Sequence, residues 1–303
     1  MVDFITNYVV SVPLDKQLAE LIGKKGSENS ITFYNRTYQG DVIVVLVPTS
    51  IEEKFYAVAE SMLMSDQIVL STASVDKQFG EIAIACGLLK KRVVLTDDNN
   101  VDRLVKESGI EDCVVSGRGS VLDKIIEKKH IEQNTKKWYR IDVDKSFDVK
   151  GIGTVVLGIV TKGSVSVHDV LAHRSGKKAT VRSIQSQDKD FETVPVYTRV
   201  GLGLKGIESD DIKKGDLLTR ESVAATDSIS AELIKSKIAR EDIEAGKIYG
   251  FVSNFSYTNA TMSSIEDSKA IMRLEKPLQI EKGDQFLLIR KEQPRIFASG
   301  RVL

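Results

Sequence analysis

The stretch WYRIDVDKSFDVKGIGTVVLGIVTKGSVSVHDVL (residues 138–171) holds the clearest structural pattern in the chain. Short apolar runs alternate with turn glycines, and helical periodicity is missing. Gly151 and Gly153 permit a tight hairpin turn or a bulge, and Thr154 begins the strand that follows. Because this G-x-G pair precedes a strand and not a helix, it is not a dinucleotide-binding fingerprint. The pattern predicts an all-β barrel or sandwich.

Residues 138–222 resemble the second domain of translational GTPases of the elongation factor Tu superfamily. The resemblance rests on the core F-x-(V/I)-x-G-x-G-T-V-x-x-G, which begins at Phe147 and ends at Gly158. It continues through VRSIQ (181–185), RVGLGLKGI (199–207) and the turn DIKKGDLL (211–218). We therefore expect a second-domain-like β-barrel over residues 137–222.

Two short stretches, VDKSF (143–147) and TRVG (198–201), are most similar to the archaeal selenocysteine-specific elongation factor. In that factor an Asp-His pair before the Phe, and an Arg, form the selenocysteinyl pocket. Here the Asp and the Arg match and a lysine takes the place of the histidine, and two cations beside one pocket favour an anion such as a selenolate. The alternative is that these are ordinary exposed barrel residues that pair with each other. The aminoacyl or tRNA contacts implied by the resemblance are Asp144, Lys145, Phe147, Arg182 and Arg199.

The final segment, IEKGDQFLLIRKEQPRIFASGRV (280–302), resembles the end of the third domain of the same factor. We expect a third-domain-like β-barrel over residues 223–303. The additional C-terminal fourth domain of that factor is expected to be absent.

Residues 1–136 follow a different pattern, in which β-branched apolar runs alternate with helical stretches. Runs that are apolar at successive positions are typical of strands buried on both faces of a parallel sheet. The region therefore predicts an α/β domain with Ser50 and Ser74 as helix N-caps. The expected strands are 8–12, 42–47, 67–72, 92–97 and 113–117, and the expected helices are 16–22, 51–64, 76–86, 100–107 and 120–129.

If the β domains resemble elongation factors, this α/β domain should be a GTPase domain, yet its phosphate loop is altered. The loop needs G-x-x-x-x-G-K-[ST], in which glycine N–H groups wrap the phosphates. Lys16 aligns with the motif lysine, but Gln17 replaces the magnesium-binding hydroxyl residue. Pro13 removes a backbone donor, and Asp15 places a negative charge where phosphate would lie.

The other GTPase motifs are altered as well. The D-x-P-G-H motif falls on residues 47–51 without its Asp or His, and the base-reading [NT]-K-x-D falls on residues 96–99, where Asn99 replaces its Asp. The final S-A-(K/L) element falls on Ser116, Gly117 and Arg118.

Phosphoryl transfer depends on the positioning and the charge that these motifs supply. We therefore predict a degenerate P-loop GTPase-like domain that neither binds nor hydrolyses GTP. Within SGRGS (116–120) a residual anion site is conceivable, and a relic turn with an exposed Arg is the alternative. The residues of this degenerate nucleotide site are Lys16, Gln17, Asn99 and Ser116.

Composition sets further limits on function. Lys plus Arg equals Asp plus Glu at 43 each, which argues against a protein that coats DNA and leaves room for a local basic face. The two cysteines are predicted to be reduced core residues of a cytoplasmic protein. No signal peptide or membrane span is expected, nor any metal or cofactor. None of the three histidines has a Cys or carboxylate partner at ligand spacing, so we expect surface residues and no Ser-His-Asp arrangement.

The sequence thus predicts a translation elongation factor-like protein that is not an enzyme. It would bind aminoacyl-tRNA, the ribosome or translation factors through its β-barrels. In this family the nucleotide state switches the domain arrangement, so a chain without GTP should stay in one arrangement. A divergent but working GTP-binding factor and a protein–protein scaffold that keeps only the fold remain alternatives.

Overall fold

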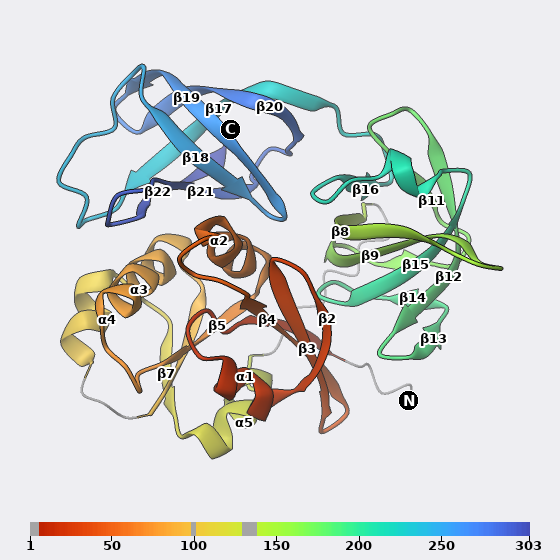
Figure 1. Ribbon diagram of the computed structural model, residues 1–303, viewed down its shortest axis with the longest axis horizontal. Coiled ribbons are helices and arrows are strands. Elements are labelled where there is room, and N and C mark those ends of the chain that lie inside the picture. Colours follow the sequence, from red (N-terminus) through yellow and green to blue (C-terminus); the bar gives the residue numbers. More distant parts are fainter. Residues whose placement is uncertain (1–5, 98–100, 129–137) are drawn as a thin grey trace. The chain divides into compact units, whose positions relative to one another are not determined.

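The computed structural model describes residues 6–97, 101–128 and 138–303, and it opens with a seven-stranded sheet (Figure 1). The five expected strands are present and parallel: β1 (Asn7–Ser11), β4 (Asp41–Pro48), β5 (Gln67–Ser71), β6 (Arg92–Thr96) and β7 (Cys113–Ser116). The strand order is β2-β3-β4-β1-β5-β6-β7. Every residue of β1 and β5 is buried, which is what their uninterrupted apolar runs predict.

Two strands were missed in the sequence. β2 (Lys24–Glu28) and β3 (Ile31–Tyr38) run antiparallel and make the sheet mixed at one edge. All five residues of β2 are exposed, so this edge strand carries none of the apolar periodicity by which strands are recognised.

The five expected helices form, and all but the first start one to four residues later than expected. The structure has α1 (Lys16–Ile22), α2 (Phe55–Met64), α3 (Lys77–Leu89), α4 (Asp102–Ser108) and α5 (Val121–Ile126), with a short 3-10 helix at Arg118–Ser120. The predicted N-caps were wrong. Lys54 precedes α2 without a side-chain cap, and Asp76 caps α3 by accepting a hydrogen bond from Phe79 N at 2.9 Å.

The second β region forms a barrel whose main strands are β8 (Arg140–Val149), β9 (Gly153–Lys162), β12 (Lys178–Ser186) and β15 (Arg199–Lys205). The order β11-β16-β8-β9-β15-β12 closes through a β11–β12 pairing. Gly151 and Gly153 have φ angles of +85° and +91°, which explains why the hairpin between β8 and β9 uses glycine. The shorter elements are β10 (Val165–Ser166), β11 (Val170–Ala172), β13 (Lys189–Phe191), β14 (Thr193–Val194), a 3-10 turn (Ser209–Asp211) and β16 (Leu217–Thr219).

The last region is a closed antiparallel barrel in the order β17-β20-β19-β18-β21-β22. The predicted fold class, an α/β domain followed by two β-barrels, is therefore confirmed. The strands are β17 (Ala225–Lys235), β18 (Ile248–Ser253), β19 (Ser256–Glu266), β20 (Lys269–Gln279), β21 (Gln285–Ile289) and β22 (Ile296–Val302).

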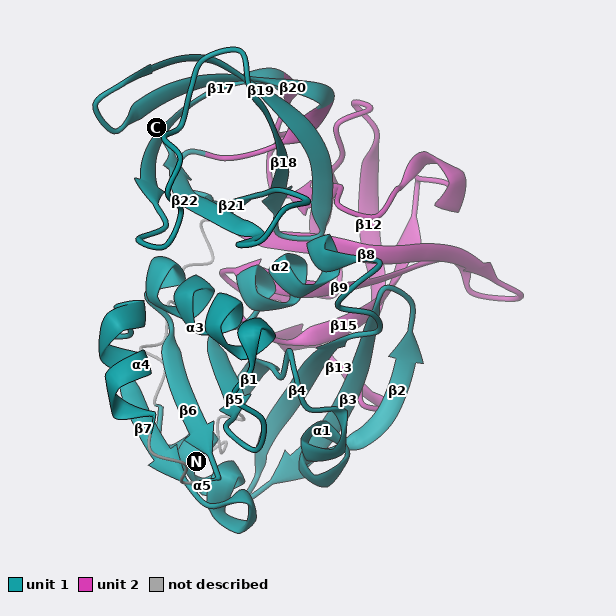
Figure 2. Ribbon diagram, turned by 60° about the vertical axis from the view of Figure 1, so that its left-hand side comes forward, with its two compact units in different colours: residues 1–129, 227–276, 282–303 teal, residues 130–226, 277–281 magenta. Residues whose placement is uncertain are grey.

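In space the chain forms two compact units (Figure 2). Unit 1 joins residues 1–129 with residues 227–276 and 282–303, and unit 2 contains residues 130–226 and 277–281. The α/β region and the last barrel thus pack as one unit, although the second region separates them in sequence. The boundaries at 136/137 and 222/223 stay predictions, because this spatial grouping does not test them.

One continuous apolar core joins the two parts of unit 1. Val252, Leu287 and Ile296 of the last barrel belong to the same buried cluster as residues of α2 and α3. Tyr56 of α2 also stacks on Tyr257 of β19, with 5.1 Å between ring centroids. We call this contact between α2, α3 and the last barrel the joint.

A charged pair is buried inside the joint. Arg295, just before β22, donates from Nη2 to Glu81 Oε2 of α3 at 2.7 Å and from its backbone N to Glu81 Oε1 at 2.6 Å. Its Nη1 donates to Ile51 O at 3.0 Å, and the guanidinium lies 4.0 Å from the ring centroid of Phe55. Arg295 therefore fixes the turn before α2 as well as α3.

We expect Glu81→Gln to destabilise the protein by about 3–5 kcal/mol, because it leaves the charge of Arg295 buried without a counter-ion. Urea unfolding followed by circular dichroism measures this loss. Glu107→Gln is the matched control, since Glu107 pairs with Arg103 on the surface of α4, and such pairs contribute about 0.3–0.5 kcal/mol. Equal effects of the two substitutions would show that the joint does not depend on the buried pair.

Candidate functional site

The carboxyl ends of β1, β5, β6 and β7 meet at one edge of the sheet, where the sequence places the altered nucleotide motifs. After β1 the chain turns into α1 through Pro13 and Asp15 without any glycine. Asp15 is the N-cap of α1, because its Oδ1 accepts a hydrogen bond from Leu18 N at 2.8 Å. A carboxylate thus satisfies an amide of the helix terminus that could otherwise face an anion.

The side chain of Arg118 lies between two carboxylates at this edge. Its Nε donates to Asp97 Oδ1 and Oδ2 at 2.7 and 2.9 Å, and its Nη2 donates to Asp15 Oδ2 at 2.6 Å. Nη2 also lies 3.2 Å from Ser71 Oγ. We call Asp15, Ser71, Asp97 and Arg118 the Arg118 network. It ties together the ends of β1, β5, β6 and β7.

The network shifts the pKa values of two of its members, Asp97 and Arg118. The hydrogen bonds from Arg118, helped by those from Thr96 and Ser71, hold the pKa of the Asp97 carboxyl below its usual value. The Asp97 carboxylate in turn raises the pKa of Arg118. Asp97 has a left-handed backbone with φ of +63°, a conformation that Asp tolerates better than most residues. The side chain of Arg118 is 30% exposed and engaged by two carboxylates, so the expected exposed relic Arg was wrong.

Three of the four predicted nucleotide-site residues, Lys16, Gln17 and Ser116, have side chains that take no part in this network. Lys16 and Gln17 are exposed at the start of α1, and Lys16 Nζ lies 4.0 Å from Glu20 Oε1. Ser116 Oγ donates to Gly117 O at 2.9 Å, and Asn99 lies outside the described residues. The signal that could have revealed the network is a pattern of opposite charges, Asp15, Asp97 and Arg118, at the ends of strands that neighbour one another in the sheet.

The second predicted site, in unit 2, contains a buried ion pair. Arg199 of β15 donates from Nη2 to Asp144 Oδ2 of β8 at 2.9 Å, with 10% and 5% of these side chains exposed. Burial lowers the pKa of Arg199, and the Asp144 carboxylate opposes that shift. The two residues pair as the alternative interpretation expected, but they are buried and not exposed.

The other three residues of this predicted site differ in environment. Lys145 is exposed and its Nζ lies 5.7 Å from the ring centroid of Phe147, a cation–π contact. Arg182 is exposed on β12. Of the three predicted cations, Lys145 and Arg182 are therefore exposed, while the charge of Arg199 is balanced by Asp144.

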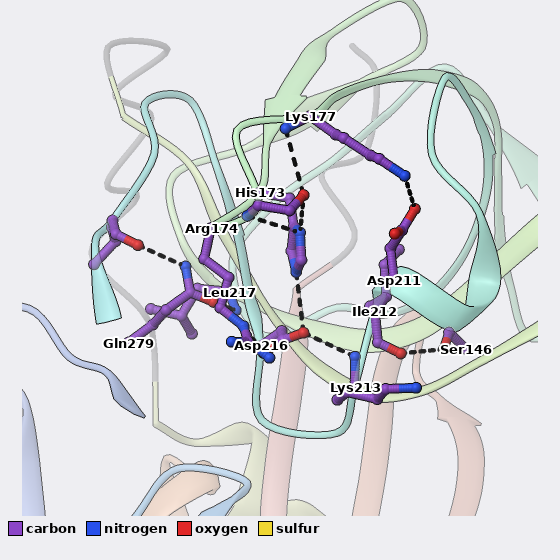
Figure 3. A network of polar contacts seen from close by, with 12 residues as sticks. Ser146, His173, Arg174, Lys177, Asp211, Ile212, Lys213, Asp216, Leu217 and Gln279 are labelled. Atoms are coloured by element: carbon purple, nitrogen blue, oxygen red, sulfur yellow. Dashed lines mark hydrogen bonds and ion pairs between the residues drawn. The ribbon is translucent and has the colours of Figure 1, made fainter. Parts of the chain in front are cut away.

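The expectation for the histidines was wrong at His173. This side chain is 1% exposed, and its Nε2 lies 3.0 Å from Asp216 Oδ2 (Figure 3). Its partner is 43 residues away in sequence, so no spacing rule could have found it. His168 is exposed as expected, and His130 lies outside the described residues.

In residues 6–97, 101–128 and 138–303, no three His, Cys, Asp or Glu side chains are placed to hold a metal ion. Over the same residues, no helix has both the length and the apolar character needed to cross a membrane.

Comparison with known proteins points to translation factors. Residues 153–219 match the family of elongation factor Tu domain 2. An uncharacterized protein of Methanocaldococcus jannaschii is 28% identical over 278 residues, covering 88% of this chain and 90% of that protein. The selenocysteine-specific elongation factor of the same organism is 26% identical over 209 residues, covering 60% of this chain and 45% of the factor.

The fold is shared with solved elongation factors. The crystal structure of translation elongation factor SelB from Methanococcus maripaludis, in complex with the GTP analogue GppNHp, aligns with a TM-score of 0.80. The alignment covers 99% of this chain and 79% of that one at 17% identity. The chain spans less than half the length of the selenocysteine-specific factors that it matches in sequence, 28% and 45%.

We expect the Arg118 network to make stability depend on pH through Asp97. Because its pKa is lowered, the Asp97 carboxylate stabilises the fold above the ordinary Asp pKa of about 4, and this contribution is lost as pH falls through the lowered value. Asp97→Asn should therefore destabilise the protein at pH 7 and much less at about pH 3. Urea midpoints at both pH values measure this.

Asp188→Asn is the matched control for Asp97→Asn, since Asp188 also has a positive φ, of +59°, and Asn tolerates that conformation. The control should leave the urea midpoint nearly unchanged at both pH values. An Asp97→Asn effect that is the same at both pH values would contradict the assigned charge of the network.

Proposed function

We propose that this chain, which belongs to the translational GTPase superfamily near the selenocysteine-specific elongation factors, has lost GTP binding and hydrolysis. In this proposal it works as a constitutive binder of aminoacyl-tRNA or of the translation machinery, in the cytoplasm. The observation that carries the loss of GTP is the Arg118 network. Its guanidinium and two carboxylates lie where the sequence aligns the phosphate loop and the base-reading motif.

The charges at this edge argue against a nucleotide. Asp15 and Asp97 would both repel the phosphates of GTP, and the Arg118 charge that could attract them is already balanced by these carboxylates. Asp15 also takes the Leu18 amide, and Pro13 has no amide hydrogen to offer. Binding of GTP would have to break several charge-assisted hydrogen bonds without a glycine cradle to replace them.

The joint supports the proposal that the chain binds its partner constitutively, without a nucleotide switch. Arg295 of the last barrel holds both α3, through Glu81, and the turn before α2, through Ile51 O. That turn begins at Ile51, the last of the residues aligned with the lost D-x-P-G-H motif. The segment is thus ordered by a protein side chain, so its conformation has no need of a nucleotide.

Exposed cations of the second barrel support the choice of partner. Lys145 lies against Phe147, and Arg182 is exposed on β12 of the same barrel. A cation beside an aromatic ring, as at Lys145, is suited to an anion and a stacked base or aminoacyl group, and a lone exposed cation such as Arg182 is suited to a phosphate. The buried Asp144–Arg199 pair is charge-balanced, so Lys145 is the cation left for an anionic aminoacyl group.

Isothermal titration with GTP and Mg²⁺ should give no binding heat. A translational GTPase with an intact phosphate loop, titrated in the same buffer, is the positive control. A Kd tighter than about 10 μM would establish the alternative of a divergent but working GTP-binding factor. This Kd corresponds to a binding free energy of about −7 kcal/mol.

Filter binding of aminoacyl-tRNAs, without added nucleotide, should detect a complex. Arg182→Gln should weaken it for every tRNA and reduce the slope of log K against log salt by about 1, because one phosphate contact is lost. Lys77→Gln, on the exposed start of α3, is the control and should change neither quantity. The tRNA proposal fails if no aminoacyl-tRNA binds, and the scaffold alternative then stands.

A further inference from the structure

A polar cluster in unit 2 lies outside both sites described above. It is centred on the turn between β11 and β12, residues 173–177, which the hydrogen bonds His173 N to Lys177 O and Gly176 N to His173 O close at 3.0 Å each. Ser175 is exposed in this turn, while the His173 side chain is 1% exposed. The turn thus places an accessible hydroxyl beside a buried imidazole.

The imidazole connects a carboxylate to that hydroxyl. His173 Nε2 lies 3.0 Å from Asp216 Oδ2, and His173 Nδ1 lies 2.9 Å from Ser175 Oγ. The same three groups, carboxylate, imidazole and hydroxyl, activate the serine of serine hydrolases, where the carboxylate orients the ring and the ring accepts the serine proton. Here the ring is turned, so that Nδ1 and not Nε2 faces the serine.

The charge of Asp216 determines which nitrogen carries the proton. Burial alone would raise the pKa of the Asp216 carboxyl, but hydrogen bonds from His173 and Lys213 N and the charge of Arg174 lower it overall. Arg174 Nε donates to Asp216 Oδ1 at 2.7 Å, and Lys213 N donates to Oδ2 at 2.8 Å. A carboxylate can only accept, so His173 Nε2 carries the hydrogen and Nδ1 keeps its lone pair. The Ser175 hydroxyl lies 2.9 Å from Nδ1, and the Ser175 backbone N also donates to Nδ1, at the longer distance of 3.3 Å.

We propose that Ser175 is a nucleophile that accepts an acyl group from activated esters, with His173 as its base and Asp216 as a positioning residue. Ser175 Oγ attacks the ester carbonyl carbon and its proton moves to His173 Nδ1. The bond from that carbon to the leaving oxygen then breaks, and the proton passes to the leaving alcohol. The products are an O-acyl serine and a free alcohol, with no change of oxidation state.

The surrounding amides indicate acylation without turnover. Gly176 N donates to His173 O, and Lys177 N lies 3.4 Å from Ser175 Oγ, so the two amides that follow the nucleophile are engaged within the turn. Such amides would otherwise stabilise the oxyanion that forms in acylation and again in hydrolysis of the acyl group. An activated ester has a good leaving group and can react without this help, whereas the O-acyl serine is an ordinary ester. The acyl group should therefore stay on Ser175, which makes the turn a modification site.

The test replaces the hydroxyl with a thiol, whose activation can be read from a pH profile. In Ser175→Cys, the rate of alkylation by iodoacetamide should report a thiol pKa at least about 1 unit below the 8.5 of free cysteine. Mass spectrometry assigns the label to position 175. Burial raises the pKa of both native thiols, Cys86 and Cys113, so their labelling should be slow.

Three further variants show whether a lowered pKa of the thiol at position 175 comes from His173 and Asp216 or only from exposure to solvent. Ser268→Cys places a thiol at an exposed position of the β19–β20 turn and should show the profile of a free cysteine. His173→Asn or Asp216→Asn, each added to Ser175→Cys and checked for folding by circular dichroism, should move the thiol pKa back toward that of the control. The proposal is overturned if the thiols at 175 and 268 titrate alike, or if the second substitution changes nothing in a folded protein.

The wild-type chain gives the complementary readout. Treatment with p-nitrophenyl acetate should release up to one equivalent of p-nitrophenol in a burst without steady turnover, and the acetyl group should map to Ser175. Ser175→Ala should abolish the burst. Acetylation confined to lysines, or a burst that survives Ser175→Ala, would contradict the assignment.

Discussion

The buried Glu81–Arg295 ion pair is the interaction on which the arrangement of unit 1 depends. It joins α3 to the last barrel across 214 residues of sequence, and the same guanidinium holds the turn before α2. A buried pair adds little net stability over an apolar contact, but separating its partners leaves an uncompensated charge in the core. The pair therefore disfavours any sliding of the barrel over α2 and α3, and the shared apolar core adds to that cost.

The Arg118 network imposes a similar constraint at the carboxyl ends of the parallel strands. There the strand ends that would surround a nucleotide are joined by a guanidinium between two carboxylates. Unit 1 thus combines strand ends without an open cradle and a last barrel that protein contacts alone tie to α2 and α3. Together these contacts support the proposal that unit 1 keeps one arrangement, with its α/β part acting as a support for the last barrel.

The sequence predicted the elements that depend on local chemistry or on burial patterns. The glycines at 151 and 153 marked the β8–β9 hairpin, and uninterrupted apolar runs marked the five parallel strands. β2 escaped detection because a fully exposed edge strand has no apolar pattern. The Arg118 network and the pairs Glu81–Arg295 and His173–Asp216 also escaped, because each joins residues that only the folded chain brings together. Considered by itself in the sequence, a charged residue is predicted to lie on the surface. It can be buried when the fold brings a partner of opposite charge beside it.

Sequencing the RNA that co-purifies with the full chain, without added GTP, tests the central claim most directly. We expect tRNAs to be enriched over an unrelated protein purified in the same way, and we expect added GTP and Mg²⁺ to leave the enrichment unchanged. Enrichment that requires GTP would contradict the loss of the nucleotide switch. Absence of tRNA above the control would contradict a role as a tRNA binder and leave only the fold of a translation factor.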